Sequence, residues 1–410
     1  MSLERLPTEL VHEIFGLQDI HSVHKYRRIN KRLNACLSDR DFVIVLAQKS
    51  VNSVALHLQA KRTISHSIPQ VLKNILRWPD AQQTAAASIF LRGVVSVNWQ
   101  ITPNPTKEVT TGGEFPLSLL AGIPDLVDLT LYGGPVSSHI PTAISGLRKL
   151  KKLNLGFLGI SGEIPADAFV QLRYLQVLKL HSNKLFGFVP AAIGSIFTLT
   201  TLNLASNNLD GNIPTELGNL VALEVLQLDE NNLTGVIPVS ILGLRNLKDF
   251  RLSSNNLEGS IPTEIEGLES AEKIFLQYNK FTGEIPGVFS KLKKLNTLLL
   301  QNNSLTGEIP DVIYDSKTLN QLFLNNNKLT GRISEKVSNC INLKQFDVAC
   351  NKLTGKLPVQ LGKLKLEYFN VNRNDMEEIL DMEMNWESEV YQSLTALGWT
   401  VATEKKVLKE

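Results

Sequence analysis

The chain has 410 residues, of which 43% are hydrophobic and 20% are charged, so it can bury a large core and is not a disordered polymer. Its 42 Lys and Arg nearly balance its 40 Asp and Glu, which gives no general reason to expect nucleic acid as a partner. Its three cysteines are too few for a disulfide framework or for most cysteine-built metal sites. No apolar run is long enough to span a membrane, and charged residues interrupt the start where a secretion signal needs an apolar run. We therefore expect a soluble protein of the cytoplasm or nucleus.

The first 45 residues are charged and show helical periodicity. One apolar stripe recurs at helical spacing between Leu6 and Leu17, and a second runs from Ile20 to Leu37. Pro7 and Thr8 stand where a helix begins. The pattern predicts a small all-α head over residues 1–45, followed by a helical linker and N-terminal cap over residues 46–93.

The head resembles an F-box, through its Leu-Pro pair, its spaced aliphatic residues ending in Ile14-Phe15, and the later basic helix that contains Ile29. In that family this unit binds a Skp-type adaptor, which docks on a cullin ubiquitin ligase. The resemblance implies that the adaptor-facing residues are Leu6, Pro7, Leu10, Ile14, Ile20 and Ile29. The alternative is that the N-terminal helices only cap the middle part of the chain. The basic run KYRRINKR holds apolar residues at helical spacing, so we interpret it as a solvated helix face and expect no nucleic acid.

A period of 24 residues dominates the middle of the chain, over residues 94–376. A typical unit reads LVALEVLQLDENNLTGVIPVSILG. The ten clear units begin at Leu126, Leu150, Leu175, Leu199, Leu223, Leu247, Ala271, Leu295, Leu319 and Leu343. Degenerate units flank them, one containing Val97 and one beginning at Leu366.

Each position of the unit has a physical interpretation. The Leu-x-Leu pair points one way from a short strand, and stacking of strands at about 4.8 Å makes a continuous core and one parallel sheet. The side chain of the recurring asparagine can form hydrogen bonds with the backbone of the turn, and the glycine permits a tight bend or one with positive φ. The proline fixes φ where the chain leaves the turn. Ser334 replaces that proline, which predicts a looser turn. The pattern resembles the plant-type leucine-rich repeat of the LxGxIP subclass. We therefore predict an α/β fold, a right-handed solenoid with a parallel sheet on its concave face.

The tail, residues 377–410, continues with apolar residues every three or four positions and an acidic excess. It is predicted to be an amphipathic helix that caps the open end of the solenoid.

Motifs for catalysis are missing from the sequence: there is no Gly-rich nucleotide loop, HExxH, GxSxG or CxxC, and the seven histidines are scattered. We expect no enzyme activity, no cofactor and no metal site. Cys340 is expected to be a small buried thiol.

The concave face offers a candidate binding surface. The position between the two strand leucines is polar in most units, but three successive units place Phe275, Leu299 and Phe323 there. Aromatic residues with a polar rim suit a contact site, although aromatic residues also favour exposed strands for their own sake. The predicted contact residues are Arg251, Phe275, Gln277, Tyr278, Leu299, Gln301, Phe323 and Asn325.

These observations predict a non-enzymatic interaction protein, expected to be a monomer. In the first interpretation it is an F-box-type receptor that holds a protein or peptide client on the concave face and a Skp-type adaptor at its N-terminus. The alternative is a stand-alone leucine-rich-repeat scaffold whose N-terminal helices only cap the solenoid.

Overall fold

The computed structural model describes residues 63–67, 95–100, 123–133 and 139–376. The chain divides into two compact units, residues 1–185 and 186–410. The predicted F-box-like head and the acidic tail lie outside the described residues.

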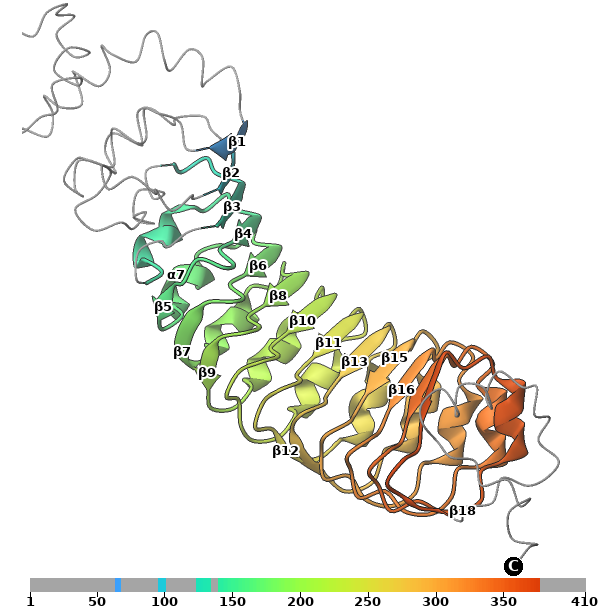
Figure 1. Ribbon diagram of the computed structural model, residues 1–410. Helices are drawn as coiled ribbons and strands as arrows, with labels where there is room; N and C mark the ends of the chain where they lie inside the picture. Colours follow the sequence, from blue (N-terminus) through green and yellow to red (C-terminus); the bar gives the residue numbers. More distant parts are fainter. Residues whose placement is uncertain (1–62, 68–94, 101–122, 134–138, 377–410) are drawn as a thin grey trace, which may run out of the picture. The chain divides into compact units, whose positions relative to one another are not determined.

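The described part of the first unit contains a parallel sheet of short strands (Figure 1). The strands follow one another in the order β1 (Thr63–Ser67), β2 (Ser96–Gln100), β3 (Asp128–Tyr132), β4 (Lys152–Asn154) and β6 (Val177–Lys179). β1 pairs with β2 in parallel, so five residues of the predicted helical segment 46–93 form a strand instead. A run of alternating Thr, Ile and Ser suits a strand, and the edge of β2 supplies its hydrogen-bonding partner.

Two short helices and a minor strand complete the described coils of the first unit. They are η3 (Thr142–Gly146), α7 (Ala166–Val170) and β5 (Ser161–Gly162), which pairs with the start of β7 (Lys184–Phe188).

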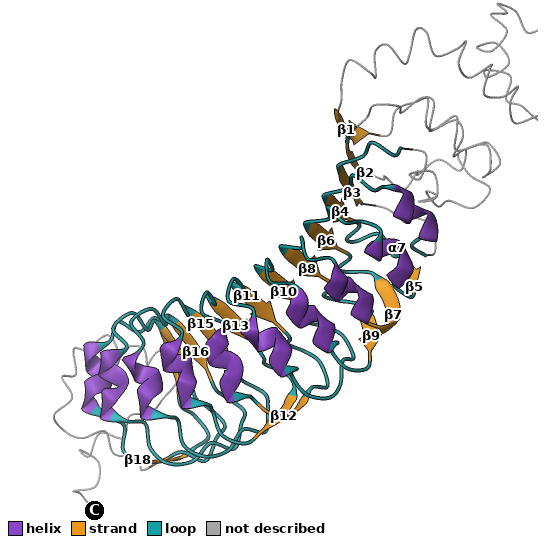
Figure 2. Cartoon of the chain, turned by 180° about the vertical axis from the view of Figure 1, so that it is seen from behind, coloured by secondary structure: helices purple, strands orange, loops and turns teal. Residues whose placement is uncertain are grey.

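The second unit repeats one coil with little variation. Its parallel sheet contains β8 (Thr201–Asn203), β10 (Val225–Gln227), β11 (Asp249–Arg251), β13 (Lys273–Phe275), β15 (Thr297–Leu299), β16 (Gln321–Phe323), β17 (Gln345–Asp347) and β19 (Tyr368–Asn370). Opposite the sheet lie 3₁₀ helices side by side, seen from behind in Figure 2. They are η4 (Ala191–Ser195), η5 (Thr215–Asn219), η6 (Val239–Gly243), η7 (Thr263–Gly267), η8 (Gly287–Lys291), η9 (Asp311–Asp315), η10 (Glu335–Asn339) and η11 (Val359–Lys363).

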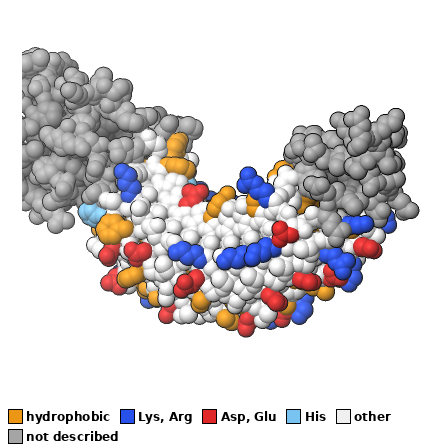
Figure 3. All heavy atoms as spheres, turned by 60° about the horizontal axis from the view of Figure 1, so that its bottom comes forward, with side chains coloured by type: hydrophobic (Ala, Val, Ile, Leu, Met, Phe, Trp, Pro, Cys, Tyr) orange, Lys and Arg blue, Asp and Glu red, His pale blue; other side chains and the backbone are white. Residues whose placement is uncertain are grey.

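In several coils a minor strand forms at or just before the repeat glycine. β9 (Asn208–Asp210) pairs with the end of β7, β12 (Glu258–Ser260) pairs with β14 (Lys280–Thr282), and β18 (Thr354–Gly355) pairs with β20 (Asp375–Met376). Figure 3 brings this side of the coils forward and shows acidic and basic side chains interspersed on it.

The core of the second unit fills the space between the sheet and the helices. In the coil that begins at Leu223, the strand leucines Leu226 and Leu228 and the following Leu233 are fully buried. Equivalent residues of the neighbouring coils are buried in the same way, so each coil covers the apolar edge of the next. The predicted solenoid with a parallel sheet is confirmed.

A ladder of asparagines joins successive coils of the second unit. The Asn231 side-chain nitrogen donates to the carbonyls of Leu204, Leu228 and Asp229 at 3.1, 3.1 and 3.2 Å, and its oxygen accepts from the Leu209 amide at 3.0 Å. One buried amide thus satisfies backbone groups of two coils that the bend leaves unpaired.

Two further turn features recur in the coils. The residue before the asparagine adopts positive φ although it is not glycine, as at Glu230, Tyr278 and Cys350. Proline stands at the N-cap of most 3₁₀ helices, and Ser334 takes its place before η10. Ser334 keeps the φ of the prolines, −70°, and accepts a hydrogen bond from the Lys336 amide, so the predicted loosening of this turn is wrong. The serine hydroxyl supplies a cap that proline cannot.

Candidate functional site: the exposed face of the sheet

The outward side chains of β11 to β19 form one continuous row across the second unit. Cα pairing places Arg251 opposite Phe275, Phe275 opposite Leu299, Leu299 opposite Phe323, and Phe323 opposite Asp347. Inward neighbours such as Ile274 and Leu298 are fully buried, so the alternate positions must face outward. Phe275, Leu299 and Phe323 are half-buried, and we call these three side chains the apolar row.

An ion pair on β11 lies at one end of the apolar row. The Arg251 Nε and Nη2 atoms donate to the two carboxylate oxygens of Asp249 at 2.7 and 2.9 Å. Gln227 donates to the same carboxylate at 3.0 Å. The guanidinium carbon lies 4.7 Å from the Phe275 ring centroid, a cation–π geometry. The hydrogen bond to Asp249 raises the pKa of Arg251. The two hydrogen bonds to one carboxylate fix the orientation of the guanidinium group.

A buried carboxylate marks the other end of the apolar row. Asp347 is only 5% exposed, and its Oδ2 atom accepts a 2.8 Å hydrogen bond from the Tyr368 hydroxyl. Its Oδ1 atom accepts from the Ala349 amide at 3.0 Å. Burial, followed by the hydrogen bond to Asp347, raises the pKa of Tyr368. The Tyr368 ring lies 5.9 Å from that of Phe323, which extends the aromatic surface by one side chain.

Amide side chains border the apolar row where the strands end. Gln277, Gln301 and Asn325 stand two residues after the members of the row, in three successive coils. Their side-chain oxygens are buried without a hydrogen-bond partner among the described residues. An unpaired buried acceptor costs about 1–3 kcal/mol, so turning such an amide toward a donor on a ligand is favourable. Tyr278 follows Gln277 at the positive-φ position and is 55% exposed.

All eight predicted contact residues therefore lie on or beside one surface of the second unit. Sequence reasoning missed Tyr368 as a part of that surface. Tyr368 falls in the irregular last coil, where the spacing to Gln345 is 23 residues rather than 24. The six predicted adaptor residues, Leu6 to Ile29, lie outside the described residues.

The described residues offer recognition groups rather than reactive ones. Within 63–67, 95–100, 123–133 and 139–376, no group of three or more His, Cys, Asp or Glu is placed to hold a metal ion. Burial raises the pKa of the Cys340 thiol to about 11, so this thiol is not poised for nucleophilic chemistry. None of the helices in those ranges is both long and apolar enough for a membrane span.

Comparisons with known proteins agree with the coil geometry. A family profile described as leucine rich repeat matches residues 148–209 and 221–281, and a second with that description matches residues 294–315 and 342–364. No curated protein matches the chain.

Several solved structures share the fold. The Arabidopsis receptor kinase HAESA, solved with the peptide hormone IDA and the co-receptor SERK1, is 33% identical with a TM-score of 0.63. That match covers 70% of this chain and 48% of the receptor, so this chain spans about half the length of HAESA. A plant ice-binding protein is 32% identical with a TM-score of 0.51, and the match covers 53% of this chain and 70% of that one.

A protein of Leptospira interrogans has the fold over a larger share of the chain. It is described as a leucine-rich-repeat protein, has a TM-score of 0.60 at 24% identity, and the match covers 82% of this chain and 80% of that protein. The matching profiles, together with the 24-residue coil and the asparagine ladder, show that the chain contains leucine-rich repeats.

Proposed function

We propose that the exposed face of the sheet from β11 to β19 binds an extended peptide, either free or as a segment of a protein client. The observation that carries the proposal is the apolar row, three half-buried large side chains in register on neighbouring strands. Exposed apolar side chains with polar neighbours are typical of interaction hot spots.

The two ends of the row favour an extended ligand with a defined direction. Arg251, locked by Asp249, stands at one end, and Asp347, locked by Tyr368, stands at the other. These groups are ordered before any ligand arrives, which lowers the entropic cost of binding. Neighbouring strands lie about 4.8 Å apart, so the row accommodates a few residues of an extended chain. The peptide hormone held by HAESA supports this class of ligand.

The test uses peptides selected from a random display library on the full chain. Their affinity is then measured for the double variant Phe275→Ala, Phe323→Ala and for the control Phe197→Ala. Phe197 is 62% exposed and lies outside the row, so the control removes the same side chain from a different surface. Each hot-spot ring contributes about 1–2 kcal/mol or more, so we expect the double variant to bind at least roughly 30-fold more weakly.

The control variant should bind as the unmodified chain does. Equal affinity of the selected peptides for the double variant would refute the proposal, provided that circular dichroism shows the same unfolding curve for both.

We propose further that residues 1–45 connect the bound client to a Skp-type adaptor, and thereby to a ubiquitin ligase. The support is the F-box-like pattern that includes Leu6, Pro7 and Ile14. The chain would then hold a client near the ligase and raise its effective concentration. Co-purification of a Skp-type adaptor with the full chain, and its loss on removal of residues 1–42, is the expected result. If the full chain does not retain the adaptor, the stand-alone scaffold is the correct alternative.

A further inference from the structure

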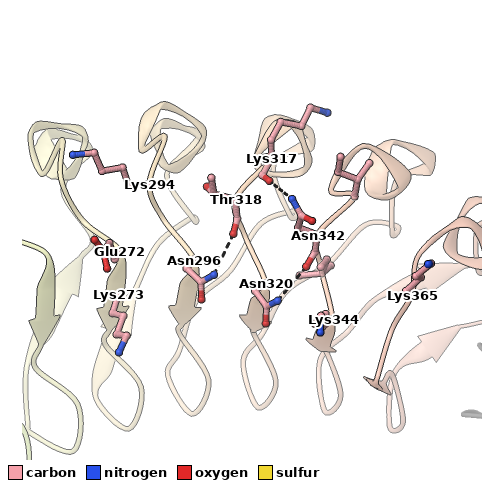
Figure 4. Close-up of a pocket in the computed structure, with 12 residues that line it drawn as sticks. Glu272, Lys273, Lys294, Asn296, Lys317, Thr318, Asn320, Asn342, Lys344 and Lys365 are labelled. Carbon is pink, nitrogen blue, oxygen red and sulfur yellow. Dashed lines mark hydrogen bonds between the residues drawn. The ribbon is translucent and has the colours of Figure 1, made fainter.

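A second surface of the second unit carries an unbalanced positive charge. It is a shallow groove of about 740 Å³ along the edge where the chain leaves each helix and enters the next strand (Figure 4). Five lysines and one carboxylate line it: Lys273, Lys294, Lys317, Lys344, Lys365 and Glu272.

Most of these lysines form no ion pair with a carboxylate among the described residues. Lys317 donates to the backbone carbonyl of Asn339 at 2.8 Å, and Lys294 reaches the Ser270 hydroxyl at 3.4 Å. Lys273 and Lys365 are exposed and form no ion pair with a described residue. Lys344 is the one groove lysine that forms an ion pair within the described part of the chain, with Glu367 at 2.6 Å. On other coils the same edge is balanced, as in the Lys248–Glu224 pair at 2.8 Å.

The walls of the groove are built rigidly from amide side chains. Asn342 donates to the Lys317 carbonyl at 2.6 Å, and Asn320 donates to the Asn342 carbonyl at 3.3 Å. Asn296 donates to the Thr318 carbonyl at 3.4 Å, so each wall is tied to the next coil (Figure 4). The lysine backbones are therefore held at coil spacing without a ligand, which keeps the positive field in place.

The chain supplies an acidic segment directly after the last described residue. Residues 377–389 read EEILDMEMNWESE, with six carboxylates and no basic residue. Eleven residues join Lys365 to Met376, so these two residues are at most about 40 Å apart. The thirteen residues after Met376 span about 43 Å when extended, which suffices to return to Lys365.

We infer that the acidic segment 377–389 of this chain docks along the lysine groove. Charge complementarity favours the contact, and covalent attachment gives the segment a millimolar effective concentration that an acidic partner in solution would have to exceed. The docked segment covers the strand-entry edge of the last coils. This gives the predicted acidic cap a counter-surface on the solenoid.

Zero-length carbodiimide cross-linking of the full chain tests the inference, because it joins only lysines and carboxylates already in contact. At low ionic strength and low protein concentration, mass spectrometry should find cross-links within one copy, from Glu377–Glu389 to the five groove lysines. The variant Lys273→Glu, Lys365→Glu should reduce cross-links to the remaining groove lysines roughly tenfold. A matched control, Lys280→Glu with Lys328→Glu, reverses two exposed lysines of the minor-strand side and should change nothing.

Added salt at about 0.5 M should reduce the cross-links as the groove variant does, because it shortens the Debye screening length to a few ångströms. Three results would overturn the inference: no cross-link from the segment to the groove, cross-links that persist after charge reversal of the groove, or cross-links formed only between two copies. Far-UV circular dichroism of each variant verifies that the coils remain folded.

Discussion

Replacing Asn255 by alanine should reveal how much one rung of the asparagine ladder contributes to stability. The Asn255 amide donates to the carbonyls of Leu228, Leu252 and Ser253 at 3.0, 3.1 and 3.1 Å. Its oxygen accepts from the Leu233 amide at 2.9 Å. The rung therefore joins the coil that begins at Leu247 to the coil before it.

The expected loss comes from the groups that alanine leaves unpaired. The buried Leu233 N–H loses its acceptor, which costs about 1–3 kcal/mol. The carbonyls keep a second lone pair and cost less, so we add about 1 kcal/mol for the Leu228 carbonyl in the adjacent coil. The sum is about 3 kcal/mol. The effect should be local, since each coil contacts only its neighbours.

The assay compares Asn255→Ala with Asn256→Ala. The Asn256 side chain makes no hydrogen bond to a described residue, so its removal should change stability by no more than about 0.5 kcal/mol. Residues 123–376 contain no tryptophan, so urea unfolding is followed by circular dichroism rather than by tryptophan fluorescence. Hydrogen exchange by mass spectrometry should show faster exchange at Leu233 in Asn255→Ala alone. Equal stability of the two variants with unchanged exchange at Leu233 would refute the assigned role of the ladder.

Two further predictions concern packing and pH. A Cβ at Gly218 would lie 2.6 Å from the Cβ and carbonyl oxygen of Ser240, whereas one at Gly243 would meet no described atom within 4 Å. Gly218→Ala should therefore lower the free energy of unfolding by about 1–3 kcal/mol. Gly243→Ala should leave it unchanged or raise it slightly. Equal urea midpoints for the two variants would contradict the close approach of η5 and η6. Burial, and secondly the charge of Lys179, lowers the pKa of His181 below 6.5. The neutral imidazole therefore contributes fully to stability above pH 6.5, and this contribution is lost as the pH falls through the folded-state pKa. Thermal melts between pH 7.5 and 5 should show this loss of stability in the unmodified chain and a smaller loss in His181→Gln. If the melting temperatures of the two proteins fall in parallel with pH, His181 is not the group responsible.

The period of the sequence determined the architecture of the coils. Leucines such as Leu226 and Leu228, two residues apart, had to face inward together, and Asn231 stood where the bend leaves backbone groups unpaired. These features arise from local geometry, because every coil repeats the same strand, bend and helix. The same arithmetic placed Phe275, Leu299 and Phe323 in one row before the pairing of their strands was known. It failed where the repeat weakens, at β1, which lies in a segment predicted to be helical.

Only the tertiary structure showed how side chains from different coils combine. Tyr368 binds Asp347 across 21 residues, and Gln227 binds Asp249 across 22. The excess of lysine charge in the groove likewise depends on which carboxylates reach which lysines, since Lys344 meets Glu367 while Lys365 has no carboxylate partner among the described residues. Such contacts depend on the rotamers of long side chains and on small shifts between coils. A repeat period states which residues stack above one another, but it does not specify where their flexible ends meet.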